Sequence, residues 1–188
     1  MFQSLRTQFL VSATHLRDTN FFKSVILLIE HTKTGAMGVI INRPMDVSIT
    51  EALSKNFELP ESDKCLYSGG PVEPTALLIL HGEYPQAEAK AEVMPGLFVG
   101  TQSSIFDTIA ESLNDPSSTF QYRLFAGYSG WDGGQLESEI ARGDWYLIPG
   151  EASYVFHNDP YEVWDDLLQK VHEQSGVITD RAQKHEWN

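Results

Sequence analysis

The chain has 188 residues, of which 41% are hydrophobic, and this suits one globular domain with a sizeable core. Its 26 Asp and Glu against 13 Lys and Arg give a formal net charge of −13. Nucleic-acid binding relies on clustered Lys and Arg, which this sequence lacks, so we expect no direct nucleic-acid partner. The longest apolar runs, Val25–Ile29 and Ala76–Leu80, are far shorter than the ~20 residues that cross a bilayer, so we expect no membrane partner. Cys65 is the single cysteine, and without a signal-like segment this favours the cytoplasm.

Apolar runs between turn signals predict strands in the first quarter of the chain. We expect them over Phe9–Val11, Ser24–Glu30 and Ala36–Asn42. The second and third should form a central hairpin. Because Pro44 cannot donate to a ladder, pairing should stop at Asn42 and Arg43 and leave both side chains exposed at a strand end.

Capping signals and 3.6-residue spacing predict further helices, between strands marked by short apolar runs. Ser48 and Glu51 form a capping box for the first helix, which Pro60 ends. A second helix is expected over 103–115, and the last runs from an Asp159 cap to Gly176. Further strands are predicted over Lys64–Tyr67, Thr75–His81, Leu97–Gly100 and Asp144–Ile148, with a surface excursion over 84–94. Residues 1–176 then form one domain, and 177–188 a mobile tail.

The most distinctive stretch runs from Gly127 to Glu139 and contains four glycines. The alternating apolar residues before it predict a strand, and the residues after it predict a helix that a left-handed Gly143 ends. We therefore expect a glycine-rich turn in which at least one of Gly130, Gly133 and Gly134 has positive φ. Gly130 in particular should not tolerate valine.

This stretch, with its order Gly-Tyr-x-Gly-Trp-x-x-Gly-Gln-Leu-Glu, resembles a signature of the AlgH/YqgE family of bacterial proteins. Three other blocks resemble that family in the same order: Gly35–Pro44, Ser68–Val72 and Leu80–Gly82. The resemblance implies an α+β fold with a mixed, bifurcated sheet curled toward a pseudo-barrel and flanked by helices. A three-layer α/β sandwich is the alternative. The resemblance implies no established reaction, and its suggestion of regulated transcription fits an indirect effect best because the chain is acidic.

Candidate chemical groups do not form a complete catalytic set. Histidines lie at the ends of predicted elements, at His31, His81 and His157, but their spacing matches no metal motif, so we expect no metal and no cofactor. Ser129 lacks the second glycine of a nucleophile elbow. Cys65 has no neighbouring base and is expected to be a buried core thiol.

The composition around the glycine stretch is typical of recognition. The candidate ligand-binding residues are His31, Asn42, Arg43, Tyr128, Trp131, Gln135 and Glu137. They predict a non-enzymatic cytosolic binding or regulatory protein that recognises a protein or a small polar ligand. Gln135→Ala should then leave the stability almost unchanged.

The alternative is an enzyme in which His31 or His81 is the general base and Arg43 clamps an anion. Convergence of His31, Arg43 and Glu137 in a concave pocket would favour the enzyme. A flat surface there would favour binding. The sequence gives no indication of the oligomeric state.

Overall fold

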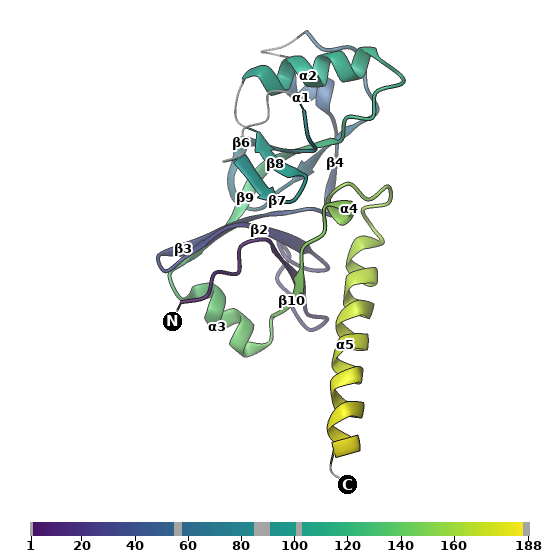
Figure 1. Cartoon of the computed structure of the whole chain (residues 1–188). Coiled ribbons are helices and arrows are strands. Elements are labelled where there is room, and N and C mark those ends of the chain that lie inside the picture. Colours follow the sequence, from purple (N-terminus) through teal and green to yellow (C-terminus); the bar gives the residue numbers. More distant parts are fainter. Residues whose placement is uncertain (1, 55–57, 85–90, 101–102, 186–188) are drawn as a thin grey trace.

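The chain folds around one mixed sheet with helices on its surfaces (Figure 1). The computed structural model describes residues 2–54, 58–84, 91–100 and 103–185, with the backbone alone for 103 and 175–185. In these ranges the strands are β1 Gln8–Ser12, β2 Val25–Thr32, β3 Gly35–Ile40, β4 Pro44–Ser48, β5 Cys65–Ser68, β6 Val72–His81, β7 Glu92–Met94, β8 Leu97–Gly100, β9 Tyr122–Asp132 and β10 Trp145–Pro149. The helices are α1 Ile49–Leu53, α2 Ser103–Asn114, α3 Gln135–Arg142, α4 Ala152–Val155 and α5 Val163–His185.

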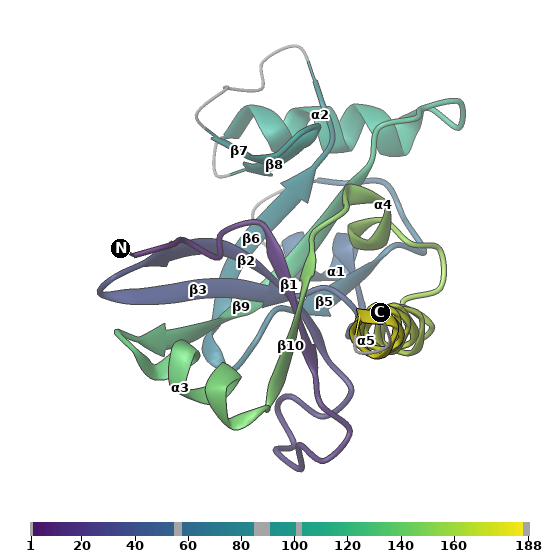
Figure 2. The same ribbon diagram turned by 60° about the horizontal axis from the view of Figure 1, so that its bottom comes forward.

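The sheet branches at β9. Eight strands follow the order β10-β1-β2-β3-β9-β6-β8-β7, and β5 and β4 leave this path. Along one edge β9 pairs with β6. Along the other it pairs first with β5, in parallel at Phe125 and Ala126, and then with β3 over Ser129–Asp132. Figure 2 shows how strongly the strands curl around one another. The α+β class and the bifurcated, curled sheet are therefore confirmed, and the three-layer sandwich is not.

Glycines make the branch possible because backbones approach one another closely there. Gly127 in β9 has φ 69°, and a Cβ on it would lie 2.6 Å from the carbonyl oxygen of Gly70 and 2.8 Å from that of Val72. The carbonyl of Gly69 accepts hydrogen bonds from the amide of Ile40 at 2.9 Å and from the hydroxyl of Ser129 at 3.2 Å. Ser129 is thus fully buried and holds the branch together.

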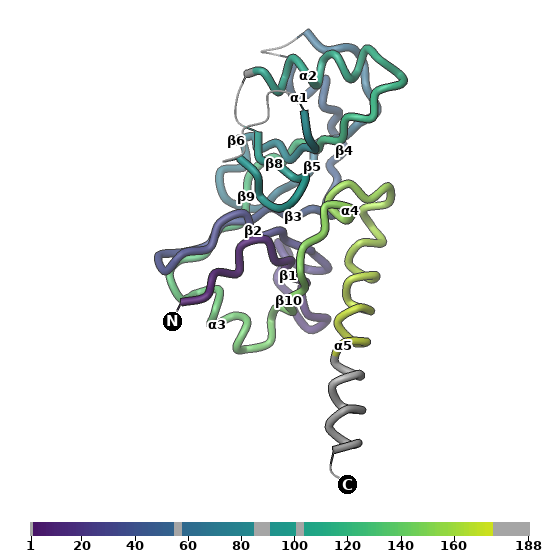
Figure 3. Tube along the Cα trace, in the orientation of Figure 1, coloured from purple at the N-terminus to yellow at the C-terminus, as the bar shows by residue number. Residues whose placement is uncertain are grey.

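The buried apolar side chains form three clusters, and β9, whose path Figure 3 shows, contributes to each of them. Phe9 and Val11 of β1 face the cluster that α5 covers, whereas Leu10 faces the cluster that α3 covers. The continuous apolar run of β2 is buried on both faces for the same reason. A further cluster lies beneath α1 and α2, at the other end of β9. Within the described residues, no helix is long and apolar enough to cross a membrane.

Several predicted elements are confirmed. The β2–β3 hairpin, β6, β8, α2 and β10 lie close to their expected ranges. The hydroxyl of Ser48 accepts the amide hydrogen of Glu51 at 3.1 Å, which is the Ser48 half of the predicted capping box. Gly134 and Gly143 flank α3 with φ of 80° and 85°, so both the positive φ near the turn and the left-handed cap are correct.

Other expectations are wrong. The strand β9 continues to Asp132, so Gly130 lies inside a strand with a φ outside the left-handed region, and the nearest atoms to a Cβ there are 3.7 Å away. The helix α5 begins at Val163, after a turn over 160–162, although the Asp159 carboxylate accepts the amide hydrogen of Tyr161 at 2.9 Å as an N-cap would. The helix backbone continues past Gly176. Sequence reasoning also missed β4, β7 and α4.

Two expectations fall partly outside the described residues. The first predicted helix ends at Pro60, whereas α1 ends at Leu53, and residues 55–57 between them are not described. The surface excursion over 84–94 includes 85–90, which are not described either. A mobile tail over 177–188 concerns residues whose side chains lie outside the described part, and it stays a prediction.

Candidate functional site

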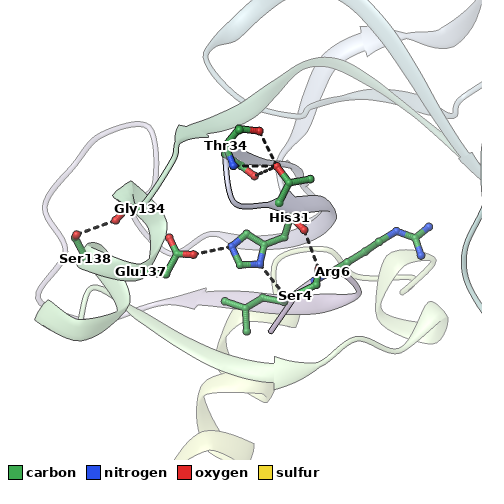
Figure 4. A network of polar contacts seen from close by, with 10 residues as sticks. Ser4, Arg6, His31, Thr34, Gly134, Glu137 and Ser138 are labelled. Atoms are coloured by element: carbon green, nitrogen blue, oxygen red, sulfur yellow. Dashed lines mark hydrogen bonds and ion pairs between the residues drawn. The ribbon is translucent and has the colours of Figure 1, made fainter. Parts of the chain in front are cut away.

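His31 is built into the interior near the start of α3 (Figure 4). Its Nδ1 accepts the amide hydrogen of Leu5 at 2.7 Å, so its proton is on Nε2, which lies 3.0 Å from a carboxylate oxygen of Glu137. The hydroxyl of Ser4 donates to the His31 carbonyl at 2.9 Å. Both ring nitrogens are therefore engaged, and the imidazole fastens the N-terminal segment and α3 to β2.

The Glu139 carboxylate forms hydrogen bonds with side chains of the glycine stretch and of β10. It accepts the indole N–H groups of Trp131 and Trp145, each at 2.8 Å, and the amide of Gln135 at 2.9 Å. The Gln135 oxygen in turn accepts the amide hydrogen of Asp132 at 3.1 Å. Trp131 is buried, and the Tyr128 hydroxyl lies 3.5 Å from a Glu73 carboxylate oxygen. Gln135 is exposed at the start of α3, as expected, and its side chain also supports the turn before the helix. Its role in recognition stays a prediction.

Asn42 and Arg43 lie at the other end of the β2–β3 hairpin. Asn42 is buried, not exposed as expected. Its side-chain Oδ1 accepts the backbone amide hydrogen of Val25 at 2.8 Å, and its Nδ2 donates to the Lys23 carbonyl at 2.9 Å. The Arg43 guanidinium donates to the carbonyls of Asn20 and Phe22. Burial lowers the pKa of Arg43, with Asp18 acting in the opposite direction. Both residues stabilise the loop that enters β2.

The three residues of the enzyme alternative do not converge. His31 and Glu137 meet, but Arg43 follows the opposite end of β3, since His31 pairs with Ala36 while Ile26 pairs with Ile40. His81 is buried between aromatic rings, its Nδ1 lies 2.7 Å from the Gly82 carbonyl, and burial lowers its pKa. Neither histidine lines any of the cavities described below.

A cavity of about 460 Å³ lies elsewhere, at the start of the parallel pair β5–β9, and we call it the Arg123 cavity. The α4–α5 connection closes one side of it. Its lining residues are Ile49, Asp63, Lys64, Cys65, Tyr67, Tyr122, Arg123, Phe156, His157 and Asn158. A larger cavity of about 680 Å³ beside α2 has Glu83 and Asp115 as the charged side chains among its described lining residues. Of these two cavities, the Arg123 cavity is the one with described basic groups in its lining.

Arg123 is held rigidly in the wall of this cavity. Its terminal nitrogens donate to the carbonyls of Ile41, at 3.2 Å, and of His157. Its Cζ lies 4.4 Å from the centre of the Tyr67 ring, as in a cation–π contact. Burial lowers the pKa of Arg123, although an arginine stays charged. Among the described residues, no ion pair joins Arg123 to a carboxylate.

A second cation and two tyrosines complete the lining. The Lys64 ammonium lies 4.1 Å from the centre of the Tyr122 ring. Burial lowers the pKa of Lys64, against the neighbouring Asp63, and raises that of Tyr67. The Tyr122 hydroxyl is buried without a hydrogen-bond partner among the described residues, and burial raises its pKa to about 12. Cys65 is half-buried at the cavity wall, so it is not the core thiol expected from the sequence.

Sequence reasoning missed this site. Arg123 alternates with Tyr122 and Leu124, which is the pattern of a solvent-facing residue on a half-buried strand. The structure covers that face with the residues around His157. The one available signal was the basic Lys64 as the first residue of a predicted strand, which does not specify a ligand.

The fold is that of an α+β protein with a branched, half-barrel sheet. A family model described as AlgH-like matches residues 9–175, and the chain belongs to this family. It is 36% identical over 170 residues to a UPF0301 protein of Myxococcus xanthus strain DK1622, covering 89% of this chain and 91% of the relative. It is 38% identical over 160 residues to a UPF0301 protein of Marinomonas sp. strain MWYL1, covering 83% of each. The resemblance seen in the sequence blocks is thereby confirmed.

Solved structures agree with the fold. The solution structure of the AlgH protein from Pseudomonas aeruginosa is similar with a TM-score of 0.70 and 30% identity, over 89% of this chain and 90% of that one. A crystal structure of a Corynebacterium diphtheriae protein is similar with a TM-score of 0.73 and 25% identity, over 90% of this chain and 88% of that one.

Proposed function

We propose that the chain is a non-enzymatic binding protein that holds a small, negatively charged polar ligand in the Arg123 cavity. The observation that carries the proposal is a largely buried guanidinium without a carboxylate partner among the described residues, in a chain of net charge −13. A buried charge is costly unless it is paired, and an anionic ligand would supply the missing partner. The cavity volume lies in the range of small-molecule sites.

The same geometry supports binding without chemistry. Both terminal nitrogens of Arg123 are fixed by carbonyls, and the general bases of the enzyme alternative, His31 and His81, do not line the cavity. His157 does line it, but its Nδ1 lies 2.7 Å from the Asp159 carbonyl oxygen and 3.2 Å from the Asp159 amide nitrogen, so that ring nitrogen is engaged within the chain. The ligand-binding role thus passes from the predicted face around Gln135 and Glu137, whose side chains are engaged within the fold, to the Arg123 cavity. We place the protein in the cytoplasm, where the Cys65 thiol at the wall stays reduced.

Native mass spectrometry of the protein as purified from cells tests this function. We expect an adduct of small-molecule mass that Asn158→Trp removes, because Asn158 lines the cavity and the indole would fill it. Asn20→Trp is the matched control, since Asn20 is exposed and does not line the cavity. The released ligand should be unchanged after incubation with fresh protein, and its conversion would support the enzyme alternative.

The proposal also predicts thermal stabilisation by added anions that fit the cavity. Two results together would overturn it: no adduct on the native protein, and no anion among phenyl phosphate, benzoate and sulfate that raises the melting temperature of the wild type by more than it raises that of Asn158→Trp.

A further inference from the structure

We infer that the ligand of the Arg123 cavity is a phosphate monoester, a proposal that rests on the binding function proposed above. The argument has three parts: the charge of the cavity, the hydrogen-bonding state of Arg123, and the aromatic walls. Each separates a phosphate from the commoner carboxylate.

The charge balance favours a dianion. Two cations line the cavity, Lys64 directly before β5 and Arg123 within β9, against Asp63 as the acidic residue among the described lining residues. Asp63 adjoins Lys64 in the sequence, and among the described residues no ion pair joins Asp63 to Arg123. A phosphate monoester carries about −1.5 to −2 at neutral pH, which matches two cations better than a single carboxylate does.

The state of Arg123 favours a tetrahedral group. A carboxylate is typically bound by the two parallel N–H groups of a free guanidinium fork. Here both terminal nitrogens already donate to the carbonyls of Ile41 and His157, so the fork is partly occupied and Arg123 acts chiefly as a fixed positive charge. Three phosphate oxygens can instead accept from separate donors, and the donors that line this cavity include Arg123, Lys64 and Asn158, which come from three separate segments.

The aromatic walls indicate that the phosphate bears an organic group. Tyr67, Tyr122 and Phe156 line the same cavity, and its volume of about 460 Å³ leaves room beyond the charged group. The Tyr122 hydroxyl lacks a partner among the described residues. A small ring or short carbon chain would contact these walls, and one polar substituent on it could form a hydrogen bond with the Tyr122 hydroxyl. Inorganic phosphate bound beside the cations has no such organic group.

Three probes that share one ring separate the ligand classes: phenyl phosphate, benzoate and phenol. Calorimetric titrations of the full chain at pH 7.5 measure affinity, and the NMR shift of the Arg123 Nε–H reports the place of binding. We expect phenyl phosphate to bind at least about tenfold more tightly than benzoate, as befits a doubly charged group, and to move the Arg123 signal. Phenol should not bind measurably, and inorganic phosphate should bind more weakly than phenyl phosphate.

Lys64→Gln is the deciding variant. The Lys64 side chain is exposed, and its contact with the Tyr122 ring is the one described for it, so the substitution should leave the fold intact. It should weaken phenyl phosphate binding by about tenfold and benzoate binding less, in keeping with a lost charge-assisted contact. Lys33→Gln removes the same charge from the exposed β2–β3 turn and should change neither. Arg123→Gln should abolish binding, but it also removes the brace to Ile41 and His157, so its folding is checked separately.

The outcomes divide cleanly. If benzoate binds as tightly as phenyl phosphate and both move the Arg123 signal, the phosphate inference is wrong while the binding function stands. If phenyl phosphate binds but Lys64→Gln and Lys33→Gln weaken it equally, the cavity is not its site, and the inference is again wrong. If no probe binds and the native protein carries no adduct, the binding function itself fails.

Discussion

Gly127→Ala should destabilise the protein strongly, because this residue occupies the branch of the sheet. Its φ of 69° costs an L-residue about 1–2 kcal/mol. The added Cβ would also lie 2.6 Å from the Gly70 oxygen and 2.8 Å from the Val72 oxygen. These atoms belong to the backbone that turns from β5 into β6 beside the branch, and relief of such overpacking typically costs about 1–3 kcal/mol. The two contributions sum to about 2–5 kcal/mol, and we take about 3 kcal/mol, in the lower half of that range.

For a chain of this length, 1 kcal/mol corresponds to about 2–4 °C in melting temperature, so Gly127→Ala should melt about 6–12 °C lower. Gly130→Ala is the matched control in the same strand. Its Cβ would meet nothing closer than 3.7 Å, so its melting temperature should change by no more than about 2–4 °C, and upward if the lost freedom of the unfolded chain dominates. Circular dichroism melting curves measure both. A Gly127→Ala protein that melts like the wild type would refute the account of the branch, as would an equal loss in Gly130→Ala.

Three other predictions test separate parts of the structure. Glu139→Gln should cost about 2 kcal/mol in urea unfolding, because an amide cannot accept both indole hydrogens of Trp131 and Trp145 and the bond from Gln135 as a carboxylate does; an unchanged midpoint would contradict this role. Tyr122 has a pKa of about 12 in the folded chain against about 10 unfolded, so its contribution to stability is present below pH 10 and lost between pH 10 and 12. The decline in stability over that window should be shallower in Tyr122→Phe, and parallel curves would show that the hydroxyl titrates normally. Duplex DNA should not be retarded at physiological salt by a chain of net charge −13, and micromolar binding with a steep salt dependence would overturn that expectation.

Local patterns predicted the elements that are stabilised locally or buried on both faces. The apolar run of β2 predicted a central strand, and it is covered by α5 on one side and by α3 on the other. Gly143 predicted the end of α3 because a left-handed cap depends only on the adjacent turn. The signals for these elements lie within a few residues of one another in the sequence.

The branch and the site depend on contacts between distant segments, so the sequence did not specify them. Gly127 was interpreted as part of a turn, but its φ serves the close approach of the backbone at Gly70, far away in the sequence. Similarly, Asn42 was expected at an exposed strand end, yet its amide completes the entry of β2. A polar residue two positions before Pro44 has the same sequence pattern whether it is exposed at a strand end or buried. Only the position of the loop before β2 distinguishes the two cases.

The lack of a described acidic partner for Arg123 is unusual in a chain with this composition. The sequence has 26 Asp and Glu residues, and one of them pairs even with an exposed arginine, as Asp144 does with Arg142. Instead Arg123 is held by two carbonyls and an aromatic ring, which fix its position without neutralising its charge. At physiological salt, charges are screened beyond roughly 8 Å, so neither Arg123 nor the net negative charge of the chain acts on a distant anion, and a ligand gains attraction only once it is close to the cavity. An acidic protein with such a site would select anions by fit within the cavity and not by long-range attraction.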